Sequence, residues 1–280
     1  MFVGYFVWLF QLHMHFFIPV KSSFMHAIRF GSGDRLLICF HGFGEDAGKF
    51  MALLPSMHTA FTVVAIDLPF HGNSAWPHDT PFMPADLAEM IRAVLQLEKQ
   101  VRFSLMGYSL GGKIVLAAVP LFAEQVDAVI LAAPDGVILN AWYNVAVYPG
   151  WGRRLFKSFV KNPGFVFRLA RLLRFMRLLD ERIFKFLQVQ TNTEAKRKKI
   201  YDVWMAMKNL AVELEEVKGI LNSHHIKSYL FIGRYDRVIT EKTGRKFAQG
   251  LQDCHYVVLD KGHNLITEAF NNPLQAALTV

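Results

Sequence analysis

The 280-residue sequence has only two cysteines, Cys39 and Cys254, and both lie in apolar runs that are typical of strands. No spacing of Cys and His residues suggests a zinc site. A chain of this length buries enough surface to fold without disulfides, so we interpret both cysteines as small buried side chains in a reducing compartment. The sequence therefore argues against a disulfide-stapled or zinc-finger protein, and we expect neither a metal ion nor a cofactor.

The N-terminal segment, residues 1–25, is strongly apolar but lacks the features of a membrane span or a secretory signal. A spanning helix needs about 20 apolar residues, and Gln11, His13 and His15 interrupt the run. A secretory signal needs a basic stretch and a small-residue cleavage site, and neither is found. We expect a cytoplasmic protein, and three alternatives stay open for this segment: a membrane anchor, a β-rich N-terminus, or a true start at Met25.

Acidic residues are scarce between Gly150 and Ile200, where fourteen Lys and Arg residues meet three acids, a net charge of +11. The whole chain carries +8, so the excess belongs to this segment alone. We expect no nucleic acid as a partner, and a weak contact with an anionic membrane surface is an alternative.

Within this basic segment, residues 165–179 follow a helical period, with apolar side chains on one side and four arginines on the other. Asn162 and Pro163 predict the start of this helix. We expect the apolar side to pack on the core and the arginines to be solvated. The alternatives are that the apolar side roofs a substrate pocket, and that the arginines attract an anionic head group, an acyl carrier or a lipid surface. The arginines are Arg168, Arg171, Arg174 and Arg177.

Elsewhere, apolar runs of strand length alternate with helical patterns. Strands are predicted at residues 35–40, 61–66, 102–106, 126–132, 228–232 and 255–259, and helices at residues 85–97 and 113–121. The alternation predicts an α/β fold with a mostly parallel central sheet flanked by helices. Because no strand pattern occurs from residue 137 to 221, we expect a core of residues 26–136 and 222–280 with residues 137–221 inserted as a helical cap.

A Gly-x-Ser-x-Gly motif centred on Ser109 follows the strand predicted at residues 102–106. Such a strand-to-helix turn exposes the serine hydroxyl at the carboxyl edge of a sheet, and Gly107 and Gly111 let the two backbones approach closely. A serine hydroxyl is a poor nucleophile at neutral pH unless a base lies beside it. The motif therefore predicts Ser109 as a nucleophile if the chain supplies a base and an acid at the same edge.

His263 is the predicted base, because it lies beside a glycine on the loop after the last predicted strand. Three other histidines are weighed against it. His41 and His71 lie in loops at the same edge, where we expect structural hydrogen bonds, and His255 begins a strand, where we expect it to be packed.

Asp236, after the penultimate predicted strand, is the predicted acid that orients His263. A nucleophilic serine on such a strand-to-helix turn is expected to be followed along the chain first by the acid and then by the histidine, which is the order found here. Two alternatives are considered: Asp236 is a turn residue paired with Arg234 or Arg237, or the acid is Asp135, after the preceding strand.

Two backbone amides, those of Phe43 and Leu110, are the predicted oxyanion donors. Phe43 lies in a His-Gly-x-Gly turn, in which glycines give the freedom to point an amide into a pocket. The alternative is a plain glycine turn. His41, Gly42 and Tyr108 are predicted to line the substrate site.

Together these motifs resemble those of the α/β-hydrolase superfamily, and they occur in the same order along the chain. The matching stretches are residues 41–44, 67–74, 107–112, 233–236 and 262–263. The resemblance implies an α/β-hydrolase fold with an inserted cap between the sixth and seventh strands. It also implies that residues 67–74 form a structural turn, although Phe70-His71 replaces the more usual Gly-His.

The resemblance implies a serine hydrolase that cleaves a carboxylic ester or thioester through an acyl-enzyme on Ser109. Carbon–carbon hydrolysis or elimination on the same residues is the first alternative. A menaquinone-pathway lyase of the superfamily has a similar elbow but carries an arginine where this chain has Lys113. A non-catalytic binding scaffold is the second alternative. The serine disfavours the dehalogenase and epoxide-hydrolase branches, which use aspartate at the elbow.

Overall fold

A computed structural model describes residues 13–137, 141–176 and 188–279. The chain divides into two compact units. A core unit comprises residues 1–76, 82–138 and 210–280, and a cap unit comprises residues 77–81 and 139–209. Residues 1–12 of the apolar N-terminal segment lie outside the described residues, as do residues 177–179 at the end of the predicted basic helix.

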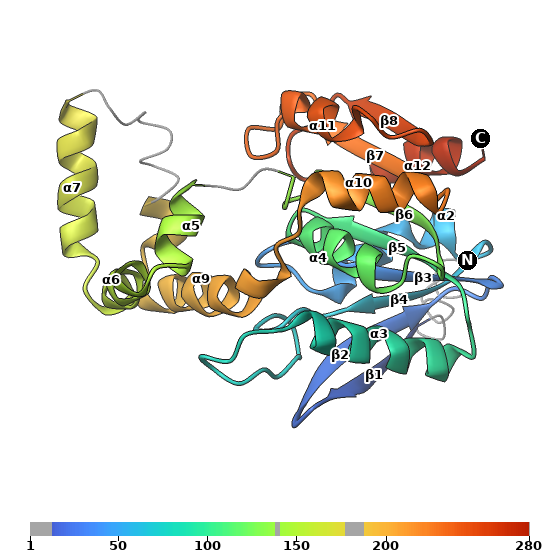
Figure 1. Ribbon diagram of the computed structural model, residues 1–280, viewed down its shortest axis with the longest axis horizontal. Coiled ribbons are helices and arrows are strands. Elements are labelled where there is room, and N and C mark those ends of the chain that lie inside the picture. The colour runs from blue at the N-terminus through green and yellow to red at the C-terminus, as the bar shows by residue number, and fades with distance from the viewer. Residues whose placement is uncertain (1–12, 138–140, 177–187, 280) are drawn as a thin grey trace, which may run out of the picture. The chain divides into compact units, whose positions relative to one another are not determined.

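The core unit is built on an eight-stranded sheet with the order β1-β2-β4-β3-β5-β6-β7-β8 (Figure 1). The strands are β1 (His13–Val20), β2 (Ser23–Phe30), β3 (Arg35–Phe40), β4 (Phe61–Ile66), β5 (Phe103–Tyr108), β6 (Val126–Ala132), β7 (Lys227–Gly233) and β8 (Cys254–Leu259). The pairs β1–β2 and β2–β4 are antiparallel, and every other pair is parallel. The predicted mostly parallel α/β sheet is confirmed.

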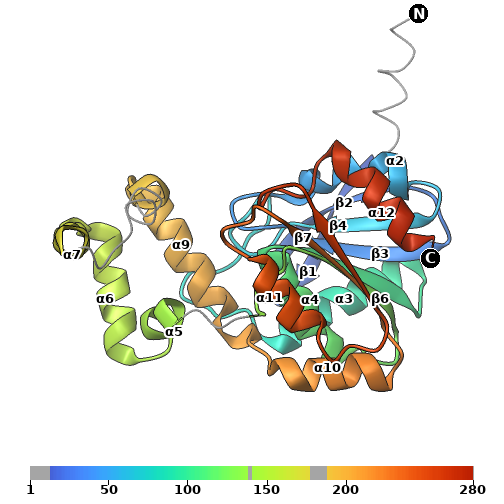
Figure 2. The ribbon, with the colours of Figure 1, turned by 90° about the horizontal axis from the view of Figure 1, so that it is seen from above.

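Helices cover both faces of this sheet. Figure 2 shows α2 and α12 on one face and α3, α4 and α10 on the other. Their bounds are α2 (Leu54–Met57), α3 (Pro84–Glu98), α4 (Leu110–Ala118), α10 (Leu214–Ser223), α11 (Glu241–Ala248) and α12 (Asn271–Leu278). Short 3-10 helices are η1 (Ala47–Leu53), η2 (Val119–Leu121), η3 (Lys208–Leu210) and η4 (Glu268–Phe270). Because helices lie on both sides, β4 and β5 are buried at every residue.

A hairpin of β1 and β2 forms the N-terminal edge of the sheet. The apolar and histidine-rich residues 13–20 therefore pair as a β-strand, which agrees with the β-rich alternative for this part of the segment. Among the described strands β1 is an edge strand that pairs with β2 alone, and several of its side chains are exposed. In the parts of the chain that the structure describes, no helix has the length and apolar character needed to cross a bilayer.

The cap unit is helical in its described residues. It contains α5 (Ala141–Val147), α6 (Gly150–Lys161), α7 (Gly164–Phe175) and α9 (Glu194–Met207), and α6 packs against each of the other three. Its small core consists of Phe156, Phe159, Val160 and Tyr201. Arg197 is buried beside this core and donates hydrogen bonds to the carbonyl oxygens of Val160 and Thr191.

Helix α7 differs from its prediction in two ways. It begins at Gly164, with Pro163 as the residue before the first turn rather than within it. Phe165 and Val166 do pack against the cap core. Four apolar side chains at or next to the helix are exposed, so the expectation that its apolar side packs on the core is wrong for those residues. These are Leu169, Leu172, Phe175 and Met176.

Candidate active site

Ser109 occupies a strained turn between β5 and α4. Its backbone has φ 49° and ψ −115°, in the left-handed half of φ space, which is unfavourable for a residue with a side chain. Hydrogen bonds hold this conformation: the Ser109 amide donates to the Ala132 oxygen, and its carbonyl accepts from the amides of Gly112 and Asp135, at 3.0, 2.8 and 2.8 Å. The turn is therefore fixed by the strands and helix around it.

Glycines on both sides of Ser109 make this turn possible. A Cβ atom on Gly111 would lie 1.8 Å from the carbonyl oxygen of Phe40, and one on Gly107 would lie 2.4 Å from that of Gly111. Both neighbours are backbone atoms, which do not move aside as a flexible side chain does. The close approach that the motif predicts is therefore present in the structure.

Substitution Gly111→Ala is expected to destabilise the protein by about 3 kcal/mol or more, because the methyl group displaces the end of β3. Gly219→Ala is the matched control. Gly219 lies inside α10 with open space around its Cβ position, so alanine is expected to stabilise the helix by about 0.5–1 kcal/mol. Urea unfolding measures the stability of both variants. Equal free energies of unfolding would contradict the conclusion that the turn at Ser109 has no room for a side chain at Gly111.

His263 lies between Ser109 and Asp236. Its Nε2 is 2.9 Å from the Ser109 Oγ, and its Nδ1 is 2.7 Å from the Asp236 Oδ2. The Asp236 side chain is fully buried, whereas 27% of the His263 side chain is exposed. Asp236 Oδ1 accepts hydrogen bonds from the amides of Val238 and Ile239, which leaves Oδ2 to orient the imidazole.

The side chains of the alternative acid and bases make contacts other than those that join Ser109, His263 and Asp236. Asp135 meets the elbow through its backbone amide, and its Oδ1 accepts from the amide of Gly136. His41 is buried, with Nδ1 donating to the Gly42 oxygen and Nε2 accepting from the Leu68 amide, and burial lowers the pKa of its imidazole. His255 stacks on Tyr229.

The predicted oxyanion turn passes beside the elbow. A Cβ atom on Gly42 would lie 2.9 Å from the ring of Tyr108, so the turn packs directly on the residue before Ser109. His71 holds the turn from behind, because its Nε2 accepts from the Gly44 amide at 3.0 Å. Leu110 is the first residue of α4, and amides in a first helical turn lack an intrahelical acceptor. The role of the Phe43 and Leu110 amides as oxyanion donors stays a prediction.

The turn at residues 67–74 holds Phe70 in an unusual backbone conformation. Phe70 adopts φ 65°, the left-handed conformation that glycine favours. Asp67 stabilises the turn, accepting hydrogen bonds from the amides of Ala47 and Asn73 at 2.6 and 2.8 Å. It also pairs with His26, whose Nδ1 lies 2.7 Å from Asp67 Oδ2. His26 was not predicted, because its partner Asp67 lies 41 residues away in the sequence.

Two further contacts fix the loop that carries His263. The Tyr108 hydroxyl donates to the His263 carbonyl oxygen at 3.1 Å. The Lys49 ammonium, on η1, donates to Asn264 Oδ1 and pairs with Glu45, each at 2.8 Å. Burial raises the pKa of the Tyr108 phenol, so this group stays protonated and available as a donor. Lys49 and Glu45 were not predicted, because neither belongs to a recognisable motif.

Lys113 is buried in the first turn of α4, close to Gly136. Burial lowers the pKa of its ammonium group to about 8, and the nearby Asp135 carboxylate opposes the shift. A group whose pKa is lower in the folded than in the unfolded state takes up a proton more readily on unfolding. The buried lysine therefore destabilises the fold in full below about pH 8, and this cost falls between about pH 8 and about pH 10.5.

Replacement of Lys113 by methionine is expected to raise the free energy of unfolding at pH 7 by about 1–3 kcal/mol. The gain should shrink between about pH 8 and about pH 10.5, because the wild-type lysine is then neutral when folded. Urea unfolding of both proteins across this pH range measures the difference. A gain that stays constant with pH would show that the buried charge is not its cause.

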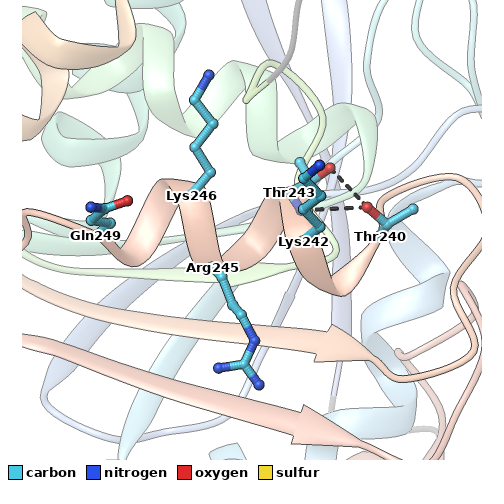
Figure 3. Close-up of a pocket in the computed structure, with 6 residues that line it drawn as sticks. All are labelled: Thr240, Lys242, Thr243, Arg245, Lys246 and Gln249. Atoms are coloured by element: carbon cyan, nitrogen blue, oxygen red, sulfur yellow. Dashed lines mark hydrogen bonds between the residues drawn. The ribbon is translucent and has the colours of Figure 1, made fainter.

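A surface hollow of about 710 Å³ lies along α11. Its lining consists of Thr240, Lys242, Thr243, Arg245, Lys246 and Gln249. Figure 3 shows Lys246 and Arg245 pointing to opposite sides of the helix, so these cations do not converge on one ligand. Among the described residues, no group of three or more His, Cys, Asp or Glu side chains is placed to hold a metal ion.

Comparison with known proteins identifies the class. The chain matches the alpha/beta hydrolase fold family over residues 35–270 and belongs to it. The "Serine hydrolase-like protein" of Danio rerio is 34% identical over 112 residues, which are 38% of this chain and 33% of that protein. The pimeloyl-[acyl-carrier protein] methyl ester esterase of Edwardsiella ictaluri is 33% identical over 114 residues, 41% of each chain.

The chain spans 33 to 61% of the length of the first curated relatives that it matches. Among solved structures, an esterase from Thermogutta terrifontis superposes with a TM-score of 0.67 at 18% identity, covering 95% of this chain and 98% of that one. A thioesterase domain from the curacin biosynthetic pathway gives 0.66 at 17% identity, covering 96% and 99%. These likenesses show the α/β-hydrolase fold.

Proposed function

We propose that the protein is a serine hydrolase that cleaves a carboxylic ester or thioester through an acyl-enzyme on Ser109. The observation that carries the proposal is the placement of His263 between the Ser109 hydroxyl and the buried Asp236 carboxylate. The strained elbow supports it, since strain of this kind clusters at functional sites. An esterase that is similar in sequence, and an esterase and a thioesterase that are similar in fold, support the substrate class.

The proposed mechanism gives each residue one role. Ser109 Oγ attacks the carbonyl carbon while His263 Nε2 accepts its proton, and Asp236 stabilises the imidazolium that results. The amides of Phe43 and Leu110 donate to the oxyanion. His263 returns the proton to the departing alcohol or thiol, leaving the acyl group on Ser109. Water then attacks with His263 as base, and the carboxylic acid is released with Ser109 regenerated.

Hydrolysis of an ester series tests this function. Esters and thioesters of graded acyl length are given to the wild type and to Ser109→Ala, together with small anionic substrates of carbon–carbon cleavage and elimination. We expect Ser109-dependent turnover of at least one ester or thioester. Turnover of the anionic substrates alone would contradict the proposal in favour of the alternative chemistry, and activity that survives Ser109→Ala would contradict the nucleophile.

Lys49 is expected to act as a positioning residue for His263. Lys49→Met removes the contacts to Asn264 and Glu45, so kcat should fall by about tenfold with little change in KM, because the imidazole is held less precisely. Lys261→Met is the matched control, since this exposed lysine lies on the same loop. Steady-state kinetics compare them, and equal kcat values would show that Lys49 does not position the loop.

A further inference from the structure

The cap unit carries an unusual share of the exposed apolar surface. Of the eighteen large hydrophobic side chains that are exposed among the described residues, nine lie between residues 145 and 189. Trp151 and Leu155 lie one turn apart on α6, with exposed fractions of 62 and 48%. Leu172 and Phe175 lie one turn apart on α7, at 54 and 86%. Two neighbouring helices of this unit therefore present large apolar side chains to solvent.

All charged residues of the same two helices are basic. Neither α6 nor α7 contains an acidic residue. The exposed basic residues are Arg154, Lys157 and Lys161 on α6 and Arg168, Arg171 and Arg174 on α7. Arg168 and Arg171 each donate Nε to a carbonyl oxygen of their own helix, four residues back, and so lie along the surface of α7. Positive charge and apolar surface thus occur together on α6 and α7.

We propose that this α6–α7 surface binds the face of an anionic lipid bilayer. Helices that combine Lys and Arg with exposed Trp, Phe and Leu lie in the interfacial plane, where apolar side chains enter the acyl boundary and the cations meet lipid phosphates. An acidic protein is the competing partner, and charge would suffice to attract it. Exposure of Phe175 and Trp151 favours lipid, because these side chains gain most from leaving water.

Vesicle sedimentation tests this surface. The full chain carrying Ser109→Ala is mixed with phosphatidylcholine vesicles with and without phosphatidylglycerol, so the outcome does not depend on hydrolysis. We expect phosphatidylglycerol to raise partitioning at least about tenfold, and about 0.5 M NaCl to reverse most of that gain. Failure to bind anionic vesicles at low ionic strength would overturn the proposal and leave the proposed enzymatic function untouched.

Paired variants distinguish lipid insertion from charge alone. Leu172→Ser with Phe175→Ser should weaken partitioning about tenfold, since both side chains enter the acyl boundary. Arg168→Gln with Arg171→Gln should weaken it and lessen its salt dependence. Val101→Ser is the control, because Val101 is exposed outside the cap unit and should change nothing.

Two results would overturn the proposal. Salt-dependent binding that is unchanged in the Leu172/Phe175 variant would mean attraction by charge alone, as an acidic protein partner requires. Unchanged vesicle binding together with impaired turnover of a short soluble ester, measured with Ser109 restored, would assign these side chains to the substrate pocket instead. Circular dichroism establishes that each variant is folded.

Discussion

Ser109→Ala is expected to lower kcat/KM for a carboxylic ester by about 10⁵-fold, because the attacking oxygen is removed while the rest of the site stays in place. Alanine tolerates the positive φ of the elbow no worse than serine does, so the free energy of unfolding should hardly change. Steady-state hydrolysis with purified protein measures the effect. A loss smaller than about 100-fold would place the nucleophile elsewhere.

Ser223→Ala is the control for this variant. Ser223 lies at the exposed end of α10, where its hydroxyl donates to the Ile220 carbonyl oxygen. The change removes the same atom from the same residue type on the surface of the molecule. Activity should therefore stay at the wild-type value, which separates the loss of the Ser109 hydroxyl from any effect of preparation or handling.

Asp236→Asn is expected to lower kcat by about 10⁴-fold. An amide has about the same shape as the carboxylate but carries no charge, so it neither fixes the tautomer of His263 nor stabilises the imidazolium. Asp135→Asn tests the alternative acid, because the side chain of Asp135 contacts its own turn. Kinetics of the two variants decide between them, and a larger loss in Asp135→Asn would contradict the role of Asp236.

Asp260→Asn is the matched control for charge. Asp260 pairs with Arg234 at 2.6 Å, and 74% of its side chain is exposed. It lies three residues before His263, so the variant removes one negative charge near the site without touching the imidazole. We expect less than a threefold change in kcat, since solvent screens an exposed carboxylate.

Much of the fold could be predicted from local patterns. The strands at residues 35–40, 61–66 and 126–132 were predicted with their observed bounds, because buried parallel strands are continuous apolar runs between turn residues. The hairpin of β1 and β2 was only an alternative. Histidines interrupt its apolar pattern, and pairing of β2 with β4 stabilises it through contacts distant in sequence.

The candidate site, like the fold, could be predicted only in part from local patterns. Ser109, Asp236 and His263 were predicted to meet because each follows a predicted strand, and parallel strands bring their carboxyl ends to one edge. In the structure His263 lies within hydrogen-bonding distance of the other two. Lys49 and His26 were missed, since each is defined by a partner elsewhere in the chain, Asn264 for Lys49 and Asp67 for His26. Helical periodicity identified α7 as amphipathic, but periodicity does not say which side is covered, and Leu169, Leu172 and Phe175 are exposed.

Covalent labelling of Ser109 tests the central claim most directly. The protein is treated with a fluorophosphonate, and the modified peptide is identified by mass spectrometry. An activated serine is expected to form one stable adduct at Ser109, which is lost in Ser109→Ala and forms much more slowly in Asp236→Asn. A folded wild-type protein that stays unlabelled, or that is labelled at another residue, would contradict the assignment of Ser109 as the nucleophile.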